Sequence, residues 1–189
     1  MATDSGEGFE GAATGGLDLS GSRGGELAGP WLAAFWVLLP IQLRSKSNFR
    51  RGTHRRWGTY RGFEEELAVE MRRFLPDGWI TEEPNSPLPT RPRYASVIAA
   101  RSVIDAGNFS KSVLDACEGV VFTNDAQVQV TTALADRSRK EPYVLVAFAQ
   151  LAPSAPCHDA ARAATSLLAA CVEIITPDQI QVSARSQGV

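Results

Sequence analysis

The middle of the chain changes its hydrophobic periodicity twice, and this change constrains the fold more than any other feature. Residues 94–104 form a largely apolar stretch with β-branched side chains, which is typical of a buried strand. Apolar residues recur at helical spacing over 108–117, Gly119 follows, and 128–134 alternates between apolar and polar or small residues. The pattern therefore predicts a strand, a helix and a strand in that order.

The helical segment between these strands has two distinct faces. Its residues are separated by the three- and four-residue steps that place side chains on one side of a helix. The apolar face consists of Phe109, Val113, Ala116 and Cys117, and the polar face of Asn108, Lys111, Ser112 and Asp115. We expect the apolar face to pack on the sheet and the polar face to be accessible.

The regions on either side extend this α+β pattern. Trp31 to Leu43 reads as a first strand, bent or at a sheet edge because of Pro40, and Arg44 to Gly58 as a polar basic loop. A helix is predicted from its apolar positions, which are Phe63, Leu67, Met71 and Phe74. Residues 78–92, with four prolines, are predicted to form a loop.

The C-terminal part is predicted to contain a hairpin and a last helix. Val120 to Phe122 reads as a short strand, and 128–134 and 143–151 as two hairpin strands joined by a basic turn. An alanine-rich helix is expected over 158–175. The predicted architecture is thus a mixed sheet of about five strands with two packed helices, one per crossover, plus a C-terminal helix.

The domain limits follow from composition. Residues 1–29 contain nine glycines and almost no large apolar side chain, so we expect a disordered acidic tail. The predicted catalytic or binding domain spans 30–152, and 153–189 form the C-terminal helix and tail.

Charge is distributed unevenly along the chain, although the net charge is only −2. Residues 1–30 carry five acids and a single arginine, whereas 44–61 carry seven basic residues and no acid. A polyanion responds to such local charge, and nucleic acid is the expected partner. The basic side chains assigned to DNA are Arg44, Lys46, Arg50, Arg51, Arg55 and Arg56.

Cysteine content and hydropathy exclude several classes of protein. The three cysteines have no CxxC spacing, which argues against a disulfide framework or structural zinc and favours a reducing cytoplasm. The longest apolar run, 31–41, is too short to span a membrane. We expect a cytoplasmic protein with no membrane association and no organic cofactor.

Carboxylates and amides cluster around the predicted helix of residues 108–117. Asp105 ends the preceding strand, and Asp125 lies in the turn into the next strand. If one sheet edge carried both residues, their carboxylates would suit Mg²⁺, which binds oxygen ligands and leaves room for phosphate. Lys111 could then contact a phosphate or stabilise a leaving oxygen, as in metal-assisted phosphodiester hydrolysis. A solvated surface helix with a turn acid explains the same residues.

The stretch from Asp105 to Val128 resembles the RusA-type Holliday junction resolvases, which are common in phages and prophages. The resemblance extends over about 36–151 and rests on the order and spacing of Asp105, Asn108, Lys111, Leu114-Asp115-Ala116, Gly119, Asn124-Asp125 and Gln127-Val128. It implies an endodeoxyribonuclease, dependent on Mg²⁺ or Mn²⁺, that acts as a homodimer on branched DNA.

The resemblance also implies roles for individual residues. Asp105, Lys111 and Asp125 would be catalytic, with Asp105 and Asp125 as metal ligands, while Asn108 and Gly119 would be structural. Where the family usually has two further aspartates, this chain has Gly107 and Asn124. Either Asp115 or the Asn124 amide completes the metal site, or the enzyme is weak or inactive.

Two other functions therefore stay open. One is a catalytically silent protein that binds branched DNA, which Gly107 and Asn124 favour. The other is a small interaction protein without nuclease activity, whose acid cluster is only a solvated helix.

Overall fold

The computed structural model describes residues 13–16, 31–43, 54–79, 87, 91–103 and 105–176, with the backbone alone at 13, 15, 16 and 54–60. These residues form a five-stranded mixed sheet of four long strands and one short one, in the order β1-β2-β5-β3-β4. The strands are β1 (Ala13–Gly16), β2 (Trp31–Leu39), β3 (Arg93–Arg101), β4 (Val128–Asp136) and β5 (Val144–Leu151). Neighbouring strands are antiparallel except β3 and β4, which are parallel. The predicted α+β fold with about five strands is confirmed.

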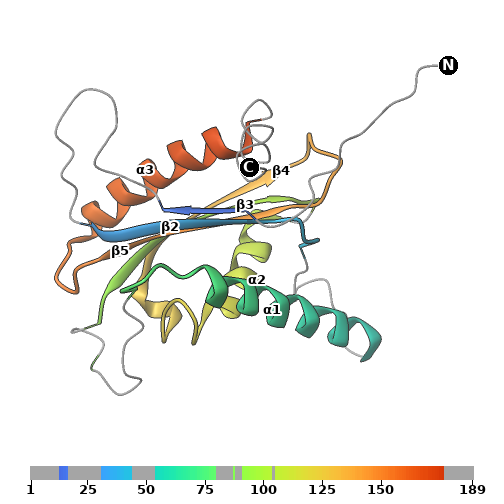
Figure 1. The fold of residues 1–189 in the computed structure, drawn as a ribbon, viewed down its shortest axis with the longest axis horizontal. Coiled ribbons are helices and arrows are strands. Elements are labelled where there is room, and N and C mark those ends of the chain that lie inside the picture. The colour runs from blue at the N-terminus through green and yellow to red at the C-terminus, as the bar shows by residue number, and fades with distance from the viewer. Residues whose placement is uncertain are drawn as a thin grey trace, which may run out of the picture.

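The helices lie on both faces of this sheet (Figure 1). Helix α1 (His54–Phe74) links β2 to β3, and α2 (Ala106–Cys117) links β3 to β4, so each serves one crossover as predicted. Both contribute to one core, with Phe63, Leu67, Phe109 and Val113 buried in it. Helix α3 (Cys157–Ile175) is the predicted C-terminal helix and covers the opposite face.

Helix α3 packs on a face built from small side chains. Ala95, Ala99, Ala147 and Ala149 of β3 and β5 are fully buried in the same cluster as the helix alanines Ala160, Ala163 and Ala164. Small residues on both elements let backbones approach closely, which preserves the dense packing of a protein interior. This pairing explains why the last helix is rich in alanine.

The predicted hairpin of 128–134 and 143–151 is wrong. Both segments are strands, but β5 lies between β2 and β3, so β3 separates it from β4. All eight residues of β5 are buried, because helices cover both faces of a central strand. A short connection does not require adjacent pairing, and the apolar character of both faces of β5 decides its position.

Three smaller predictions also need correction. Residues 54–58, expected in a loop, begin α1, so Glu64, Glu65 and Glu66 lie inside the helix and not in its first turn. Val120 to Phe122 is a turn with a single bridge between Glu118 and Phe122, not a strand. Residues 13–16, expected in a disordered tail, pair with β2 as β1; the rest of 1–29 lies outside the described residues.

Candidate functional site

Asp105 caps helix α2 at its N-terminus. Its side chain accepts a hydrogen bond from the Gly107 N–H at 2.9 Å, and its backbone carbonyl accepts from Asn108 and Phe109. The capping oxygen satisfies a backbone donor that has no partner inside the helix, and the helix dipole favours a negative charge there. The residue is exposed, so the carboxylate has a structural role and is also accessible.

The accessible face of α2 carries Asn108, Lys111 and Asp115, as predicted. The Lys111 ammonium lies 3.6 Å from the Asp115 carboxylate, with 70% of the lysine side chain exposed. An exposed pair of this kind contributes little to stability, so the ammonium can exchange this partner for another anion at small cost. Ser112, which was assigned to the same face, is instead buried and donates to the Asn108 carbonyl.

The turn after α2 is held by the aromatic core. Gly119 takes φ +75°, a left-handed conformation that favours glycine, and confirms the predicted end of the helix. The Trp79 indole donates to the Val121 carbonyl at 3.0 Å while its ring packs against Phe35 and Tyr94. The turn is therefore fixed to the core by a buried hydrogen bond.

Gln127 organises the next turn, a role that its position in the alternating pattern did not predict. It directly precedes the alternating segment 128–134, yet its exposed fraction is only 4%. Its Oε1 accepts from the Thr123 N–H, the Thr123 hydroxyl and the Asn124 N–H, and its Nε2 donates to the Pro92 carbonyl. The available signal was its place in the motif, one residue beyond Asn124-Asp125-Ala126.

Asn124 serves as the cap of a short 3₁₀ helix, η3 (Asp125–Gln127). Its Oδ1 accepts from the Ala126 N–H at 2.8 Å, and with Gln127 it forms a capping box. Its carboxamide oxygen is thus already used by the fold, which weakens its assignment as a metal ligand. Asp125, next in the chain, is exposed.

Asp105 and Asp125 lie at opposite ends of the sheet. Asp105 follows the last residues of β3, where Ser102 donates to the Asp136 carbonyl at the end of β4. Asp125 precedes β4, whose first residue Val128 pairs with Tyr94 at the start of β3. Because β3 and β4 are parallel, the crossover helix α2 returns the chain to the other end. Its 12 residues span about 18 Å.

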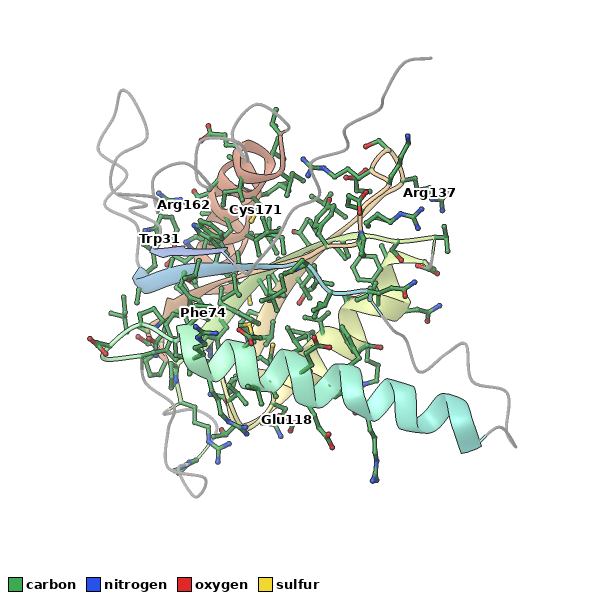
Figure 2. The ribbon with its side chains drawn as sticks, turned by 45° about the vertical axis from the view of Figure 1, so that its right-hand side comes forward. Trp31, Phe74, Glu118, Arg137, Arg162 and Cys171 are labelled. Atoms are coloured by element: carbon green, nitrogen blue, oxygen red, sulfur yellow. The ribbon has the colours of Figure 1, made fainter. Side chains whose placement is uncertain are left out.

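The prediction that Asp105 and Asp125 lie together is therefore wrong within a single chain. Figure 2 labels one residue toward each of the two ends: Glu118 follows α2 on the way to Asp125, and Arg137 follows β4 at the end where Asp105 lies. The two labelled residues lie well apart. The described residues contain no group of three or more acids, histidines or cysteines placed to hold a metal. Asp105 and Asp125 of the same copy do not fit one Mg²⁺.

Most of the predicted DNA contacts lie outside the described residues. Arg44, Lys46, Arg50 and Arg51 belong to that group. Arg55 and Arg56 lie in the first turns of α1, where only the backbone is described. Their assignment stays a prediction.

A partly buried ionic network lies at the Asp105 end of the sheet. Asp136 accepts hydrogen bonds from the Ser138 N–H and hydroxyl and from the Tyr143 hydroxyl, and Arg139 lies 3.6 Å away. Partial desolvation alone would raise the pKa of Asp136, but these hydrogen bonds and the arginine charge outweigh it and lower that pKa. Arg139 also donates to the Ile175 carbonyl, which ties the loop to α3.

We expect Asp136→Asn to lower the free energy of unfolding by about 1–2 kcal/mol, because hydrogen bonds to a charged acceptor are lost. The pKa of Asp136 is lowered in the folded state, so its stabilisation is complete above an ordinary carboxyl pKa of about 4 and is lost as the pH falls through the folded value. Denaturant unfolding at pH 7 and at pH 3 measures this, with exposed Asp77→Asn as the control. An equal loss at both pH values would contradict the assignment.

A mixed sheet with an exposed acid, lysine and amide on its crossover helix does not by itself define a DNA-processing protein. Relatives with the same residues are needed to assign that function. The family model of the endodeoxyribonuclease RusA matches residues 51–148, just over half of the chain. The chain therefore belongs to the RusA endodeoxyribonuclease family, which confirms the resemblance inferred from the motif. The match includes Asp105, Lys111 and Asp125 and excludes β1, β2 and α3.

The other comparisons add little. No curated protein matches the chain. Among the described helices, none has the length and apolar character required to cross a membrane.

Proposed function

We propose that this protein is a structure-selective endonuclease that resolves Holliday junctions and related branched DNA in recombination and repair. The observation that carries the proposal is the family match over residues 51–148, which includes the whole motif from Asp105 to Val128. The exposure of Asp105, Lys111 and Asp125 supports it, since residues that contact DNA must be accessible.

The proposal includes Mg²⁺, or Mn²⁺ in its place, as the ion that would supply an activated water and neutralise developing charge when bound. One chain does not place Asp105 and Asp125 together, so both can bind one ion only if they come from different copies. A homodimer with two-fold symmetry would contain two such shared sites. A four-way junction also has two-fold symmetry, so each site would face one of two opposed strands.

The chain's other polar residues have roles that need no metal. Lys111 would release Asp115 and hold a phosphate oxygen near the strand to be cut. The basic side chains of 44–56 would hold the arms of the junction through their phosphates, so junction shape would decide selectivity more than base sequence.

A cleavage assay on a synthetic four-way junction tests the proposal. The full chain is incubated with the junction in the presence of Mg²⁺, of Mn²⁺ or of chelator, and a linear duplex of the same sequence is the control. We expect paired cuts in the junction only with the metal. Cleavage of the duplex at the same rate would contradict structure selectivity.

A second candidate is a protein that binds branched DNA without cutting it. Gly107 and Asn124 replace two aspartates of the family pattern, and the Asn124 carboxamide is used as a helix cap. Tight junction binding without cleavage in either metal would favour this function. Absence of both binding and cleavage would favour an interaction protein.

Gly107→Asp tests whether a missing ligand limits activity. Gly107 does not have positive φ, and a Cβ there would meet only Asp105 Oδ1 at 3.6 Å, an ordinary contact. We expect cleavage at limiting Mg²⁺ to rise on the order of tenfold, because an oxygen ligand is restored. Gly107→Asn is the matched control, since it has the same shape without the charge. Equal rates for the two variants would show that position 107 does not supply a ligand.

A further inference from the structure

Arg91 lies against the turn that carries Asp125. Its guanidinium Nη1 donates to the Thr123 hydroxyl at 3.0 Å, and Asp125 follows two positions after Thr123. A chain of two residues spans at most about 7 Å, so the backbones of Thr123 and Asp125 are close together. Arg91 is partly buried, which means that the protein supports its side chain and solvent still reaches it. A cation is therefore held near one of the candidate site acids.

A closed ring of hydrogen bonds fixes this arrangement. The Thr123 hydroxyl accepts from Arg91 and donates to Gln127 Oε1 at 2.9 Å. Gln127 Nε2 in turn donates to the carbonyl of Pro92, the residue that follows Arg91. The start of β3 and the turn before β4 are thus joined twice, and Arg91 keeps its place relative to Asp125.

The guanidinium group can hold this turn and an anion at the same time. It has five N–H donors in a planar fork and stays charged at every pH at which proteins fold. The bond to Thr123 uses one donor, and a neutral hydroxyl does not cancel the positive charge. Arginine binds phosphate through two parallel N–H bonds, which fix both distance and orientation. The chemistry of Arg91 therefore suits a phosphate group.

Charged groups of both signs surround the turn. Among the described residues, those that α1, α2 and the turns after them place toward this end are the bases Arg72, Arg73 and Lys111 and the acids Glu70, Asp77, Asp115, Glu118 and Asp125. Arg93 adds nothing here, because it donates to the Ala155 carbonyl on the α3 side of the sheet. Acids outnumber these bases, so a phosphate that approaches Asp125 is repelled unless a cation contacts it. Arg91 is the cation bonded to this turn.

We propose that Arg91 binds a phosphate of the DNA backbone beside Asp125. The inference rests on the proposed function and deepens it, because it assigns a contact that positions the strand at this end of the site. One strand of DNA carries a phosphate for each 3.4 Å or so of helix axis, so a strand that reaches Asp125 also places a phosphate within reach of Arg91. Such a contact fixes position and reads no base sequence.

Arg91→Gln tests the assignment. Binding of the full chain to a four-way junction is measured in chelator, so that affinity is determined without cleavage. We expect the dissociation constant to rise about tenfold and the slope of log affinity against log salt concentration to fall by about one, because one phosphate contact and its released counterion are lost. A parental slope in folded Arg91→Gln would overturn the proposal.

Two control variants separate a phosphate contact from a structural one. Thr123→Val removes the hydroxyl to which Arg91 donates and keeps the cation, so the salt slope should equal that of the parent. Arg93→Gln removes a charge two positions away on the other face and should also keep the parental slope. If either control lowers the slope as much as Arg91→Gln does, loss of the turn or of general charge explains the effect and the proposal fails.

Chemical modification of the unaltered chain decides the question if Arg91→Gln does not fold. Phenylglyoxal reacts with accessible guanidinium groups, and mass spectrometry of peptides locates the products. Bound junction should slow the modification of Arg91 and leave that of Arg93 unchanged. An Arg91 that reacts equally with and without the junction, or that does not react in the free chain, would overturn the proposal.

Cleavage assays separate this proposal from the proposed function. If the parent cuts junctions and Arg91→Gln binds and cuts like it, the Arg91 contact is wrong and the function stands. If the parent binds without cutting and Arg91→Gln binds more weakly with a lower slope, the contact stands and the nuclease function is wrong. A parent that binds no junction overturns both.

Discussion

Asp105→Asn and Asp125→Asn should each reduce junction cleavage by at least about 100-fold, because a neutral amide replaces a carboxylate on which the metal depends. Binding to the junction should be unchanged or tighter, since removing a negative charge reduces repulsion with phosphate. Cleavage rate and junction affinity are measured on the same samples, with Asp77→Asn as a control on the exposed loop after α1. Parental cleavage in both variants would exclude these aspartates from the chemistry.

Mixing the two inactive variants makes this prediction sharper. In a dimer with shared sites, one copy would supply Asp105 and the other Asp125, so a heterodimer has one complete site and one without either acid. Equal mixing should therefore restore about a quarter of the working sites, and the product should be nicked junctions. Joint unfolding and refolding ensures that subunits exchange. A mixture that stays inactive would contradict shared sites.

Affinity for DNA should fall steeply with salt, by about a thousandfold or more between 50 and 200 mM if six or more phosphates are contacted. Replacing Arg50 and Arg51 by glutamate should weaken binding to junction and duplex alike by about tenfold or more and reduce the salt dependence, because these contacts release counterions. The matched control reverses Arg72 and Arg73, which are exposed at the far end of α1. Affinity that does not change with salt, or equal losses in both variants, would contradict the assignment.

Features set by local sequence were predicted well. The limits of α2 and the stop at Gly119 follow from periodicity and from backbone freedom, which depend on neighbouring residues alone. Asp105, Lys111 and Asp125 were identified as candidates because the spacing of a motif is also a local property. Their roles stay predictions, but their exposure agrees with them.

Features set by pairing between distant segments were predicted less well. The placement of β5 between β2 and β3 depends on burial of both its faces. The short loop from β4 suggested instead that β5 pairs directly with β4. Strand β1 consists of Ala-Thr-Gly-Gly and has little strand propensity, so its pairing depends on β2. The separation of Asp105 from Asp125 depends on the parallel direction of β3 and β4, although only 20 positions separate them in sequence.

The buried Gln127 has a consequence for how DNA would be met. Ordering one residue of a flexible loop costs about 1–2 kcal/mol of conformational entropy. Gln127 already holds Thr123 and Asn124 in place before any partner binds. The conformational entropy of the turn that carries Asp125 is therefore lost during folding and not during binding. Less of the interaction free energy is then lost to loop ordering, and a preformed turn favours DNA whose backbone already has the matching shape.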